Sequence, residues 1–498
     1  MKKRFRIPLA GSITKRVSST SILNSVSGFV GLGVIGVMVI GKTTASSAKD
    51  QNFINCFSET IVDAVTGKKR VFAVKRPGWA SSITTATADI GTALFIWTGL
   101  TSGDHVISAF GGTNSTIYKN TSSLGAITGK ATGITETFIS GVATLAITSS
   151  DSTGWYYDVP TGAATKITDA DFPGNASKTL AGTFAHLDGF AVVMTTDGIL
   201  WASDLNSITS WTATSYGSTN DYQDKGVGCV RHRNLIMAFG SESIEFWQNA
   251  GLSPFPLSRV SSMTQRVGCI SADAIAQLSG ITFWAGTSPQ GGITIYQFDS
   301  DISRISTPEV DEVMILAGTA NISLTTLRFY GRAFVLVKCA NVTLAYCMEE
   351  KTWSEWTGPW YKMVGLSIGS TLVNYAISKS LTTGAVYSMN HSAHVFKDAG
   401  ELYTVRMQLD GLDFGTTDYK AWHELNLVCD KQDSESLITV SYSDDDYNNF
   451  TIAGTMNMAE NIPALRRLGK SRRRALAFNH SSDAPMRIEA IEIVASYG

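Results

Sequence analysis

The densest group of charged side chains lies near the end of the chain. Six cations fall within nine residues: Arg466, Arg467, Lys470, Arg472, Arg473 and Arg474. Such a run can neutralise backbone phosphates without reading a base sequence, as along a channel for DNA. It can also meet acidic groups of a partner, or cover a solvated strand edge. The sequence alone leaves these alternatives open.

A second stretch has the spacing of a phosphate-binding loop. Residues 36–43 read Gly-Val-Met-Val-Ile-Gly-Lys-Thr, which matches the formal pattern. A phosphate loop needs small, flexible residues, whereas Val37 to Ile40 favour an extended, packed strand. No apolar helical period follows Thr43. We therefore expect neither nucleotide binding nor any other cofactor.

Side chains that could serve a hydrolytic propeller are scattered through the middle of the chain. Each can be read instead as a turn residue or as the start of a strand: Asp188, Asp197, Asp204, Arg231 and Arg233. The sequence has no H-E-x-x-H motif. We expect no enzymatic activity and no catalytic residues.

The cysteines predict neither a zinc site nor a disulfide framework. The chain has 6 of them, none in C-x-x-C spacing. Several sit in apolar runs, as Cys339 and Cys429 do. Because free cysteine behaves as a small hydrophobe, we expect buried thiols and no metal site.

Composition favours a β-rich protein that is covered in large part by its neighbours. Charged residues make up 16% of the 498 residues, against about 25% in ordinary soluble domains. The formal net charge is -2, so the whole-chain balance favours neither nucleic acid nor membrane. The mean hydropathy of +0.06 argues against a polytopic membrane protein.

The first residues resemble a secretory signal only superficially. Residues 1–6 are basic and residues 28–41 are apolar, but Lys15 and Arg16 make the basic region too long. The apolar run is too short for a membrane span and is interrupted by glycines. We expect a Gly-rich β-arm or hairpin.

A repeated pattern runs from about residue 85 to 400. An apolar run is followed by a turn and a second run that ends in or near an aromatic residue. The units are 94–97 with 116–118, 145–147 with 155–157, 190–194 with 199–201, 235–239 with 244–247, 281–284 with 293–296, 334–337 with 344–346, and 372–375 with 385–387. A period of roughly 40 to 50 residues is that of propeller blades.

The last hundred residues change character. Residues 403–409 alternate cleanly between apolar and polar side chains, and 437–441 and 488–494 do so less strictly. This pattern predicts an antiparallel sandwich, in which residues 443–447 form a degraded aspartate-box turn. The predicted fold is therefore all-β: a Gly-rich arm and first strands over 1–84, an irregular six- or seven-bladed β-propeller over 85–400, and a β-sandwich over 401–498.

Three blocks of sequence resemble one known family, the packaged-DNA stabilisation or tail nozzle proteins of Salmonella-type short-tailed bacteriophages. The first block runs from residue 50 to 78 and the second from 201 to 268; the third is the basic run 466–474. The matching positions are Asn52, Asn55, Glu59, Arg76, Pro77, Gly78, Gly240, Glu242, Glu245 and Trp247. The resemblance covers the chain in order from about residue 50 to its end, and residues 20–45 look like an insertion.

The resemblance implies a structural virion protein and no enzyme. It would be made in the bacterial host cytoplasm and would form a hexameric ring in the tail. Its partners would be the tail hub or adaptor, a needle or plug, and tailspikes or fibres. Its channel would pass double-stranded DNA without sequence specificity and help to retain the packaged genome. A near-neutral wall suits that passage, because a strongly basic lining would bind phosphate and slow ejection. For this reason we favour an interface for residues 466–474.

One rival function belongs to a different class. A receptor- or glycan-binding propeller, such as a phage adhesin or a glycosidase-like protein, would have the same repeat. A deep axial pocket would favour that rival, and an open ring would favour the nozzle.

The first prediction concerns Lys42. The substitution Lys42→Ala should leave particle assembly unchanged, and the protein should bind no ATP, because the residues before Lys42 favour a strand. Equilibrium binding of labelled ATP to both proteins measures this. Specific binding that disappears in the variant would show that the loop interpretation is right.

Overall fold

The computed structural model describes residues 2–8, 52–62, 67, 69–98, 105–219, 221, 222, 224–287, 291–368, 371–389 and 395–497. The Gly-rich segment 28–41 and the phosphate-loop pattern at residues 36–43 lie outside these ranges. The chain divides into two compact units. Unit 1 holds Met1–Ala80, Ala340–Gly358 and Asn390–Gly498, and unit 2 holds Ser81–Cys339 and Pro359–Met389.

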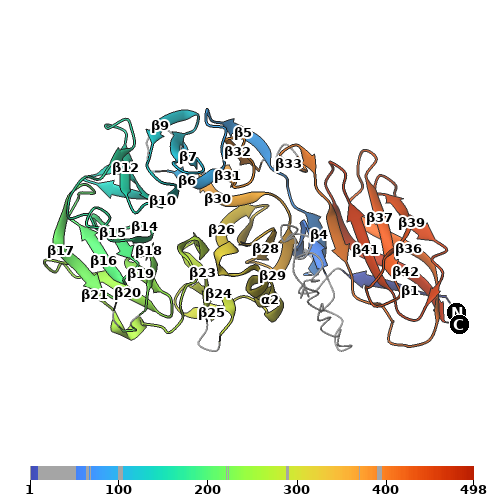
Figure 1. The fold of residues 1–498 in the computed structure, drawn as a ribbon. Coiled ribbons are helices and arrows are strands. Elements are labelled where there is room, and N and C mark those ends of the chain that lie inside the picture. The colour runs from blue at the N-terminus through green and yellow to red at the C-terminus, as the bar shows by residue number, and fades with distance from the viewer. Residues whose placement is uncertain are drawn as a thin grey trace, which may run out of the picture. The chain divides into compact units, whose positions relative to one another are not determined.

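Unit 2 contains five consecutive four-stranded antiparallel sheets (Figure 1). The first sheet holds β6 (Gly91–Trp97), β7 (His105–Phe110), β8 (Thr116–Lys119) and β9 (Ser122–Ala126), and the second holds β10 (Ala131–Ile139), β11 (Val142–Ser149), β12 (Gly154–Asp158) and β13 (Thr165–Lys166). The third holds β14 (Leu180–Leu187), β15 (Phe190–Thr195), β16 (Ile199–Ser203) and β17 (Trp211–Ser218), and the fourth holds β18 (Gly226–His232), β19 (Leu235–Gly240), β20 (Ile244–Asn249) and β21 (Leu257–Arg259). The fifth holds β22 (Ile275–Leu278), β23 (Ile281–Thr287), β24 (Ile293–Phe298) and β25 (Ile302–Arg304).

Further strands of unit 2 continue the same pattern. A hairpin joins β26 (Ile322–Phe329) to β27 (Arg332–Cys339). The strands β30 (Trp360–Ile368), β31 (Thr371–Ser378) and β32 (Ala385–Ser388) follow, and β32 pairs with β5 (Ala80–Thr84) from the start of the unit. Strands from the two ends of unit 2 therefore pair with each other in one sheet.

In four of the five sheets the sequence repeat marks the two middle strands: β11 with β12, β15 with β16, β19 with β20 and β23 with β24. In the first sheet the runs 94–97 and 116–118 lie in the edge strand β6 and in β8. In β11 and β15, every residue after the first is buried, because each middle strand has a neighbouring sheet on both faces. A continuous apolar run is the sequence pattern of such a strand.

The core of unit 2 lies between consecutive sheets. One cluster joins Trp97 and Ile107 to Leu145 and Tyr157 of the next sheet. Corresponding clusters join the following sheets as far as β24. The strands that begin the sheets also contact one another: β6 contacts β10, β10 contacts β14, β14 contacts β18, β22 contacts β26, β26 contacts β30, and β30 contacts β6 again. Between β18 and β22 the link is the 3-10 turn η2 (Ala272–Ala274), which contacts both β18 and β26, so the contacts lead around a circle.

One apolar cluster closes this circle. Ile377 of β31 and Val386 of β32 pack against Val106, Phe110 and Tyr118 of the first sheet. A Cβ atom on Gly91 would lie 2.8 Å from the Ile377 Cβ, so β6 and β31 approach as closely as glycine allows.

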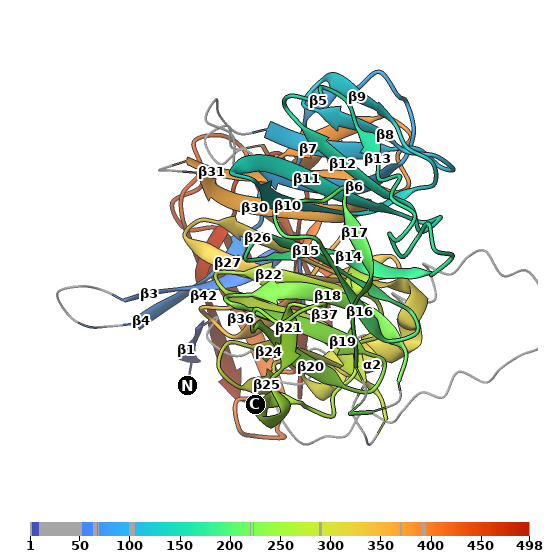
Figure 2. The ribbon, with the colours of Figure 1, turned by 90° about the vertical axis from the view of Figure 1, so that its left-hand side faces the viewer.

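Unit 1 contains two larger sheets that share a core. The first sheet holds β1 (Lys2–Pro8), β3 (Cys56–Val62), β4 (Lys69–Lys75), β36 (Lys420–Cys429), β39 (Ala464–Arg466), β40 (Lys470–Ser471) and β42 (Arg487–Tyr497). In unit 1 the second holds β2 (Asn52–Ile54), β28 (Val342–Cys347), β29 (Thr352–Trp356), β35 (Val405–Gln408), β37 (Leu437–Ser443), β38 (Thr451–Asn457) and β41 (Ala475–His480), and a short pair joins β33 (Lys397–Asp398) to β34 (Glu401–Leu402). Figure 2 shows β3 and β4 as a hairpin.

Inward-facing side chains of both sheets form one cluster. Trp422, Leu425 and Ile491 of the first sheet belong to the same cluster as Val440 and Phe478 of the second. The alternation along 437–441 and 488–494 thus comes from strands with one face on this core. Unit 1 takes in strands that precede and interrupt unit 2, so the division by compactness runs along other boundaries than 84 and 400.

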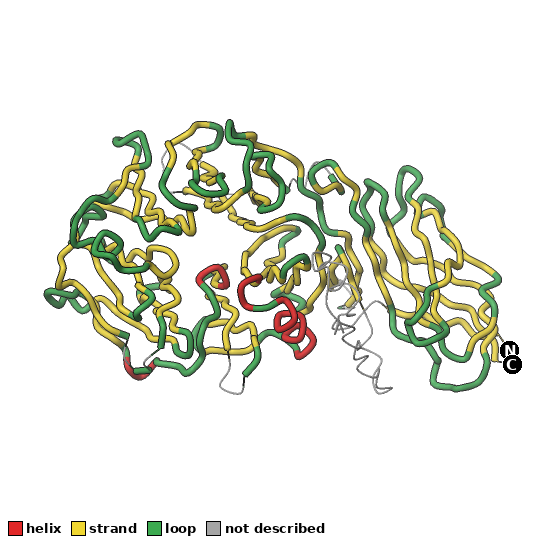
Figure 3. Tube along the Cα trace, in the orientation of Figure 1, coloured by secondary structure: helices red, strands yellow, loops and turns green. Residues whose placement is uncertain are grey.

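The all-β prediction is confirmed for the described residues (Figure 3). They contain one α-helix, α2 (Pro308–Ala317), and the 3-10 turns η1 (Ser261–Met263), η2 (Ala272–Ala274) and η3 (Thr319–Asn321). No described helix is long and apolar enough to span a bilayer. The six cysteines are free thiols, and all but the half-buried Cys429 are buried, as the sequence predicts.

The second prediction tests the closing cluster. Ile377 is fully buried, so Ile377→Ala should lower the free energy of unfolding by about 3 kcal/mol through lost burial and a residual cavity. The control is Ile315→Ala on α2, where the side chain is 54% exposed and the change should stay within about 0.5 kcal/mol. Urea unfolding followed by tryptophan fluorescence measures both. Equal effects would show that the cluster does not stabilise the closed circle.

Candidate functional site

The basic run lies on two short strands at one edge of the first sheet of unit 1. Arg466 in β39 pairs in register with Glu424 of β36, and Lys470 in β40 pairs with Ala421. The turn between the strands places Arg467 at a φ of 59°. Arg466, Arg467, Lys470 and Arg472 are exposed, Arg473 is half-buried and Arg474 is buried. The six cations are therefore in three different environments.

Arg474 belongs to the interior of unit 1. Its side chain is 2% exposed and forms two hydrogen bonds of 2.7 Å to the carboxylate of Asp444. The guanidinium stacks 4.0 Å from the ring centroid of Tyr442 and 5.2 Å from that of Trp422. A third donor reaches the Leu468 carbonyl. This planar, multiply bonded setting suits arginine and holds the end of the basic run in place.

An acidic turn compensates part of the remaining charge. The Arg473 guanidinium lies 3.5 Å from Asp446, two residues after Asp444. Between them, Asp445 accepts hydrogen bonds from the Asn449 backbone N–H and side chain and from Ser443. These bonds lower the pKa of Asp445 to about 2. Asp445 thus holds the turn at 443–449, as expected for an aspartate-box-like turn, and its neighbours meet the arginines.

Of the four exposed cations of the run, one is paired and three are not. Arg466 pairs with Glu424 at 3.3 Å, although its side chain is 76% exposed. Arg472 lies over the ring of Tyr419, 4.8 Å from the centroid. Arg467, Lys470 and Arg472 form no ion pair with another described residue. We call these three the free cations of the edge.

The first family-like block forms a buried polar node in unit 1. All five N–H donors of Arg76 are used: by Asn55 Oδ1 at 2.9 Å, the Pro77 and Thr357 carbonyls at 3.0 Å each, and both oxygens of Asp398. Asn55 adds hydrogen bonds to Thr357 and Thr404 and has a φ of 57°, which asparagine tolerates well. The buried charge is fully bonded, so this node has a structural role.

Other residues of the first family-like block also have structural roles in unit 1. Asn52 pairs in register with Gln408, and Glu59 accepts a 3.0 Å hydrogen bond from Arg487. A Cβ atom on Gly78 would lie 2.1 Å from the Lys397 carbonyl oxygen, which explains glycine at this close approach.

The second family-like block holds a turn in unit 2. Asp224 accepts hydrogen bonds from the backbone N–H groups of Glu242 and Ser243. A Cβ atom on Gly240 would lie 2.2 Å from the same carboxylate. Glu245 is 1% exposed; burial raises its pKa, while Arg259 nearby acts in the opposite direction. Trp247 packs edge to face on Phe255. These residues position the turn and do not form a reactive centre.

Four of the scattered hydrolytic candidates lie in turns or loops, and Arg231 lies near the end of β18. Asp197 pairs with Lys178 at 3.0 Å, and Asp188 accepts a hydrogen bond from Asn249. Asp204 bonds hydroxyls of its own turn, Arg231 donates to the Arg233 carbonyl, and Arg233 pairs with Asp299. None of these residues lines the pocket described next. Among the described residues, no group of three His, Cys, Asp or Glu side chains could hold a metal ion.

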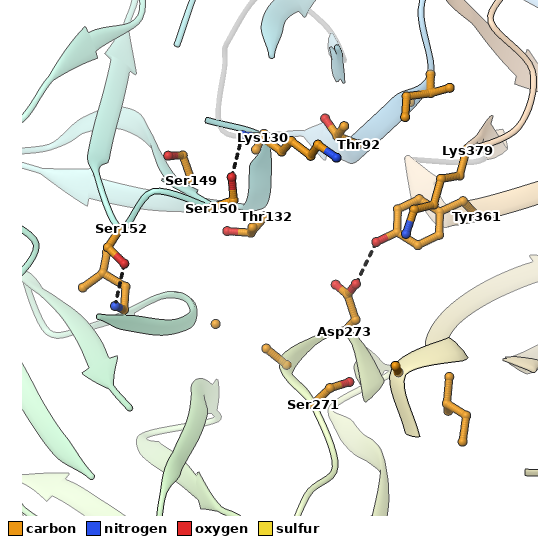
Figure 4. Close-up of a pocket in the computed structure, with 18 of the residues that line it drawn as sticks. Thr92, Lys130, Thr132, Ser149, Ser150, Ser152, Ser271, Asp273, Tyr361 and Lys379 are labelled. Atoms are coloured by element: carbon orange, nitrogen blue, oxygen red, sulfur yellow. Dashed lines mark hydrogen bonds between the residues drawn. The ribbon is translucent and has the colours of Figure 1, made fainter. Parts of the chain in front are cut away.

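Unit 2 has a pocket of about 490 Å³ at one end of the circle of first strands. It is lined where β6, β10, β14 and β30 begin, and by the turns around η2 and η3. Figure 4 shows Lys130, Asp273, Tyr361 and Lys379 among its polar side chains. This volume lies in the range of small-molecule sites.

No sequence pattern selects these pocket residues. Lys130, Asp273, Tyr361 and Lys379 come from four distant segments and belong to no motif. They share only a place at or near a strand end: Lys130 precedes β10, Lys379 follows β31, Asp273 lies in η2 before β22, and Tyr361 is the second residue of β30.

Comparison with known proteins identifies one family. A family model described as Bacteriophage P22 Gp10, beta-propeller, matches residues 110–363, just over half of the chain. Among solved structures, the chain is similar to BBS1N in complex with ARL6DN, at 11% identity and a TM-score of 0.41, over 64% of this chain and 98% of that chain. It is also similar to BamB from Moraxella catarrhalis, at 15% identity and a TM-score of 0.35, over 62% and 95% of the two chains. These structural similarities are too distant to indicate a function. No curated protein matches.

The third prediction separates the two kinds of arginine in the basic run. Arg474→Met should cost about 3 kcal/mol of stability, because it leaves Asp444 without its buried partner. Arg467→Met, at an exposed position of the same run, should change stability by less than about 0.5 kcal/mol. Chemical denaturation monitored by tryptophan fluorescence provides the comparison. If the two variants were equally stable, Arg474 would not be part of the core.

Proposed function

The chain belongs to the bacteriophage P22 Gp10 β-propeller family, and from this we propose that it is a tail nozzle subunit. Family membership makes it a structural protein of a phage particle. In the proposed role, copies of the chain form a hexameric ring below the tail hub. The ring surrounds the path of the ejected DNA and helps to retain the packaged genome. The family match carries this proposal.

The proposed architecture is a seven-bladed propeller with a β-sandwich. Five four-stranded sheets, the closing sheet of β30, β31, β32 and β5, and the hairpin of β26 and β27 account for seven blades of unit 2. The sandwich is unit 1, whose two sheets share one apolar core. Both consist almost wholly of hydrogen-bonded β-sheet around apolar cores, which suits a part of the particle that must resist the pressure of packaged DNA.

The free cations of the edge support an assembly contact in unit 1. Arg467, Lys470 and Arg472 lie beside arginines that are already paired, so they are not needed to neutralise the acidic turn. They lie on β39 and β40 or immediately beside them, at the end of the sheet, where charges also deter unwanted strand pairing. Cyclic assembly needs two different complementary faces on each subunit. We propose that these cations meet carboxylates of a neighbouring subunit or of the hub.

The weak charge of the chain as a whole fits a wall that DNA slides past. Tight binding to DNA grows with each phosphate that a protein neutralises. With 16% charged residues and a net charge of -2, the chain offers few such contacts outside the basic run. An interface for the free cations leaves the passage without a basic ring.

The rival function is a receptor- or glycan-binding propeller, and the pocket of unit 2 is the observation that favours it. Its glycosidase-like form requires two carboxylates on either side of a glycosidic bond. Among the described pocket-lining residues Asp273 is the one carboxylate, and each of its oxygens already accepts a hydrogen bond. The pocket therefore supports binding without hydrolysis, which a structural tail protein can combine with its place in the particle.

The fourth prediction tests the free cations. Replacing Arg467, Lys470 and Arg472 together by Ser should give particles without this protein, because the charged contact to the neighbouring component is lost. The control replaces Lys69, Lys351 and Lys431 by Ser, three exposed cations of the same unit at separate places. Purified particles are compared by gel electrophoresis, together with the thermal stability of each isolated protein.

Two results would contradict the proposed contact. Particles that contain the variant in normal amount but release their DNA early would place the cations at the DNA instead. Normal particles that retain their DNA would show that the cations serve neither role.

A further inference from the structure

We infer that the pocket of unit 2 binds a sugar unit that carries one negative charge. This goes beyond the nozzle function and does not depend on it, because the pocket is formed within a single copy of unit 2. The inference rests on the charges that meet in the pocket, on its hydroxyl lining, and on its size.

Both carboxylate oxygens of Asp273 already accept hydrogen bonds from neighbouring side chains. Its carboxylate accepts hydrogen bonds from the Tyr361 hydroxyl at 2.7 Å and from the Lys362 ammonium at 2.8 Å. Burial alone would raise the pKa of Asp273, but the charge and hydrogen bond of Lys362, the Tyr361 hydroxyl and the charge of Lys379 lower it overall. Lys362 and Asp273 therefore cancel each other's charge.

Two further ammonium groups line the pocket without a direct ion pair. Lys130 and Lys379 line the pocket and are exposed, and neither forms an ion pair with a described residue. Lys379 lies over the ring of Tyr361, 4.6 Å from the centroid, which holds it at the pocket. Figure 4 shows Lys130 on the β10 side and Lys379 on the opposite side, near Tyr361. The net positive charge selects an anionic ligand.

The rest of the lining is suited to hydroxyl groups. Eight Ser and Thr residues line the pocket, among them Thr92, Thr132 and Thr319. The Ser271 hydroxyl has no hydrogen-bond partner within the described part of the protein. Hydroxyls can donate and accept, as the hydroxyls of a sugar do.

The Thr92, Thr132 and Ser149 hydroxyls already form hydrogen bonds within the protein. The Ser150 and Ser152 hydroxyls accept hydrogen bonds from backbone N–H groups and keep their own hydrogen to donate. A bare inorganic anion would leave several of the remaining hydroxyls unused, and a neutral sugar would leave both ammonium groups without an anionic partner.

The size and place of the pocket agree with a small saccharide unit. A volume of about 490 Å³ falls within the usual range for small ligands. The groups come from several blades around the axis, so a ligand here contacts several sheets at once. A carboxylate or a phosphate on the sugar would meet Lys130 and Lys379 equally well.

The test uses two sugars that differ only in the charged group. Isothermal titration of the full chain with galacturonate and with galactose should show galacturonate binding about tenfold more tightly, the value of one charge-assisted hydrogen bond. In Lys379→Ala and Lys130→Ala this preference should fall or disappear. The matched control is Lys166→Ala, an exposed lysine on β13 of the same sheet as Lys130, which should bind like the unchanged protein.

Three outcomes would overturn the inference. One is equal affinity for the two sugars, and another is no heat of binding for either. The third is competition by inorganic phosphate as strong as that of galacturonate, which would make the pocket a simple anion site. Because the titration uses the isolated chain, these outcomes do not depend on whether the protein forms a tail nozzle.

Discussion

A small antiparallel sheet exposes two faces, and it cannot bury either of them by itself. In unit 2 each sheet buries its faces against the sheets before and after it, so every blade depends on its neighbours. The arrangement is stable only if the last blade also meets the first. The pairing of β32 with β5, the packing of Ile377 and Val386 on the first sheet, and the close approach of β6 at Gly91 supply that closure. The pocket is a consequence of the same constraint, because closure gathers the ends of the first strands around an axis.

The sequence predicted the middle strands of unit 2 well, for a physical reason. Runs such as 190–194 and 235–239 are apolar throughout because both faces of those strands are covered. The outer strands lack that signal: β13 has two residues, and β17 is exposed over most of its length, with Trp211 and Ser215 as its buried positions. The inclusion of β28 and β29 in unit 1 could not be predicted from the sequence either, because pairing such as Ile54 with Glu355 joins residues about three hundred positions apart.

Candidate site residues were harder to predict than strands. A count of cations made residues 466–474 look uniform, yet Arg474 is a core residue and Arg467 is exposed. The difference depends on Asp444, thirty positions earlier in the chain, which no local pattern connects to the run. The resemblance singled out Asn55 and Arg76, but their role as a fully bonded buried node is visible only in the fold. The residues of the pocket carried no pattern at all.

In this proposal the two units have separate roles. Unit 1 carries the charged edge that suits assembly, and unit 2 carries a closed propeller with a pocket suited to an anionic sugar. We propose above all that the chain is a ring-forming tail component, and cryo-electron microscopy of intact particles can locate it. We expect a hexameric ring of this chain below the hub, with DNA along its axis. Density for the chain at the tip of a fibre or on the capsid, or no density in the tail, would contradict it.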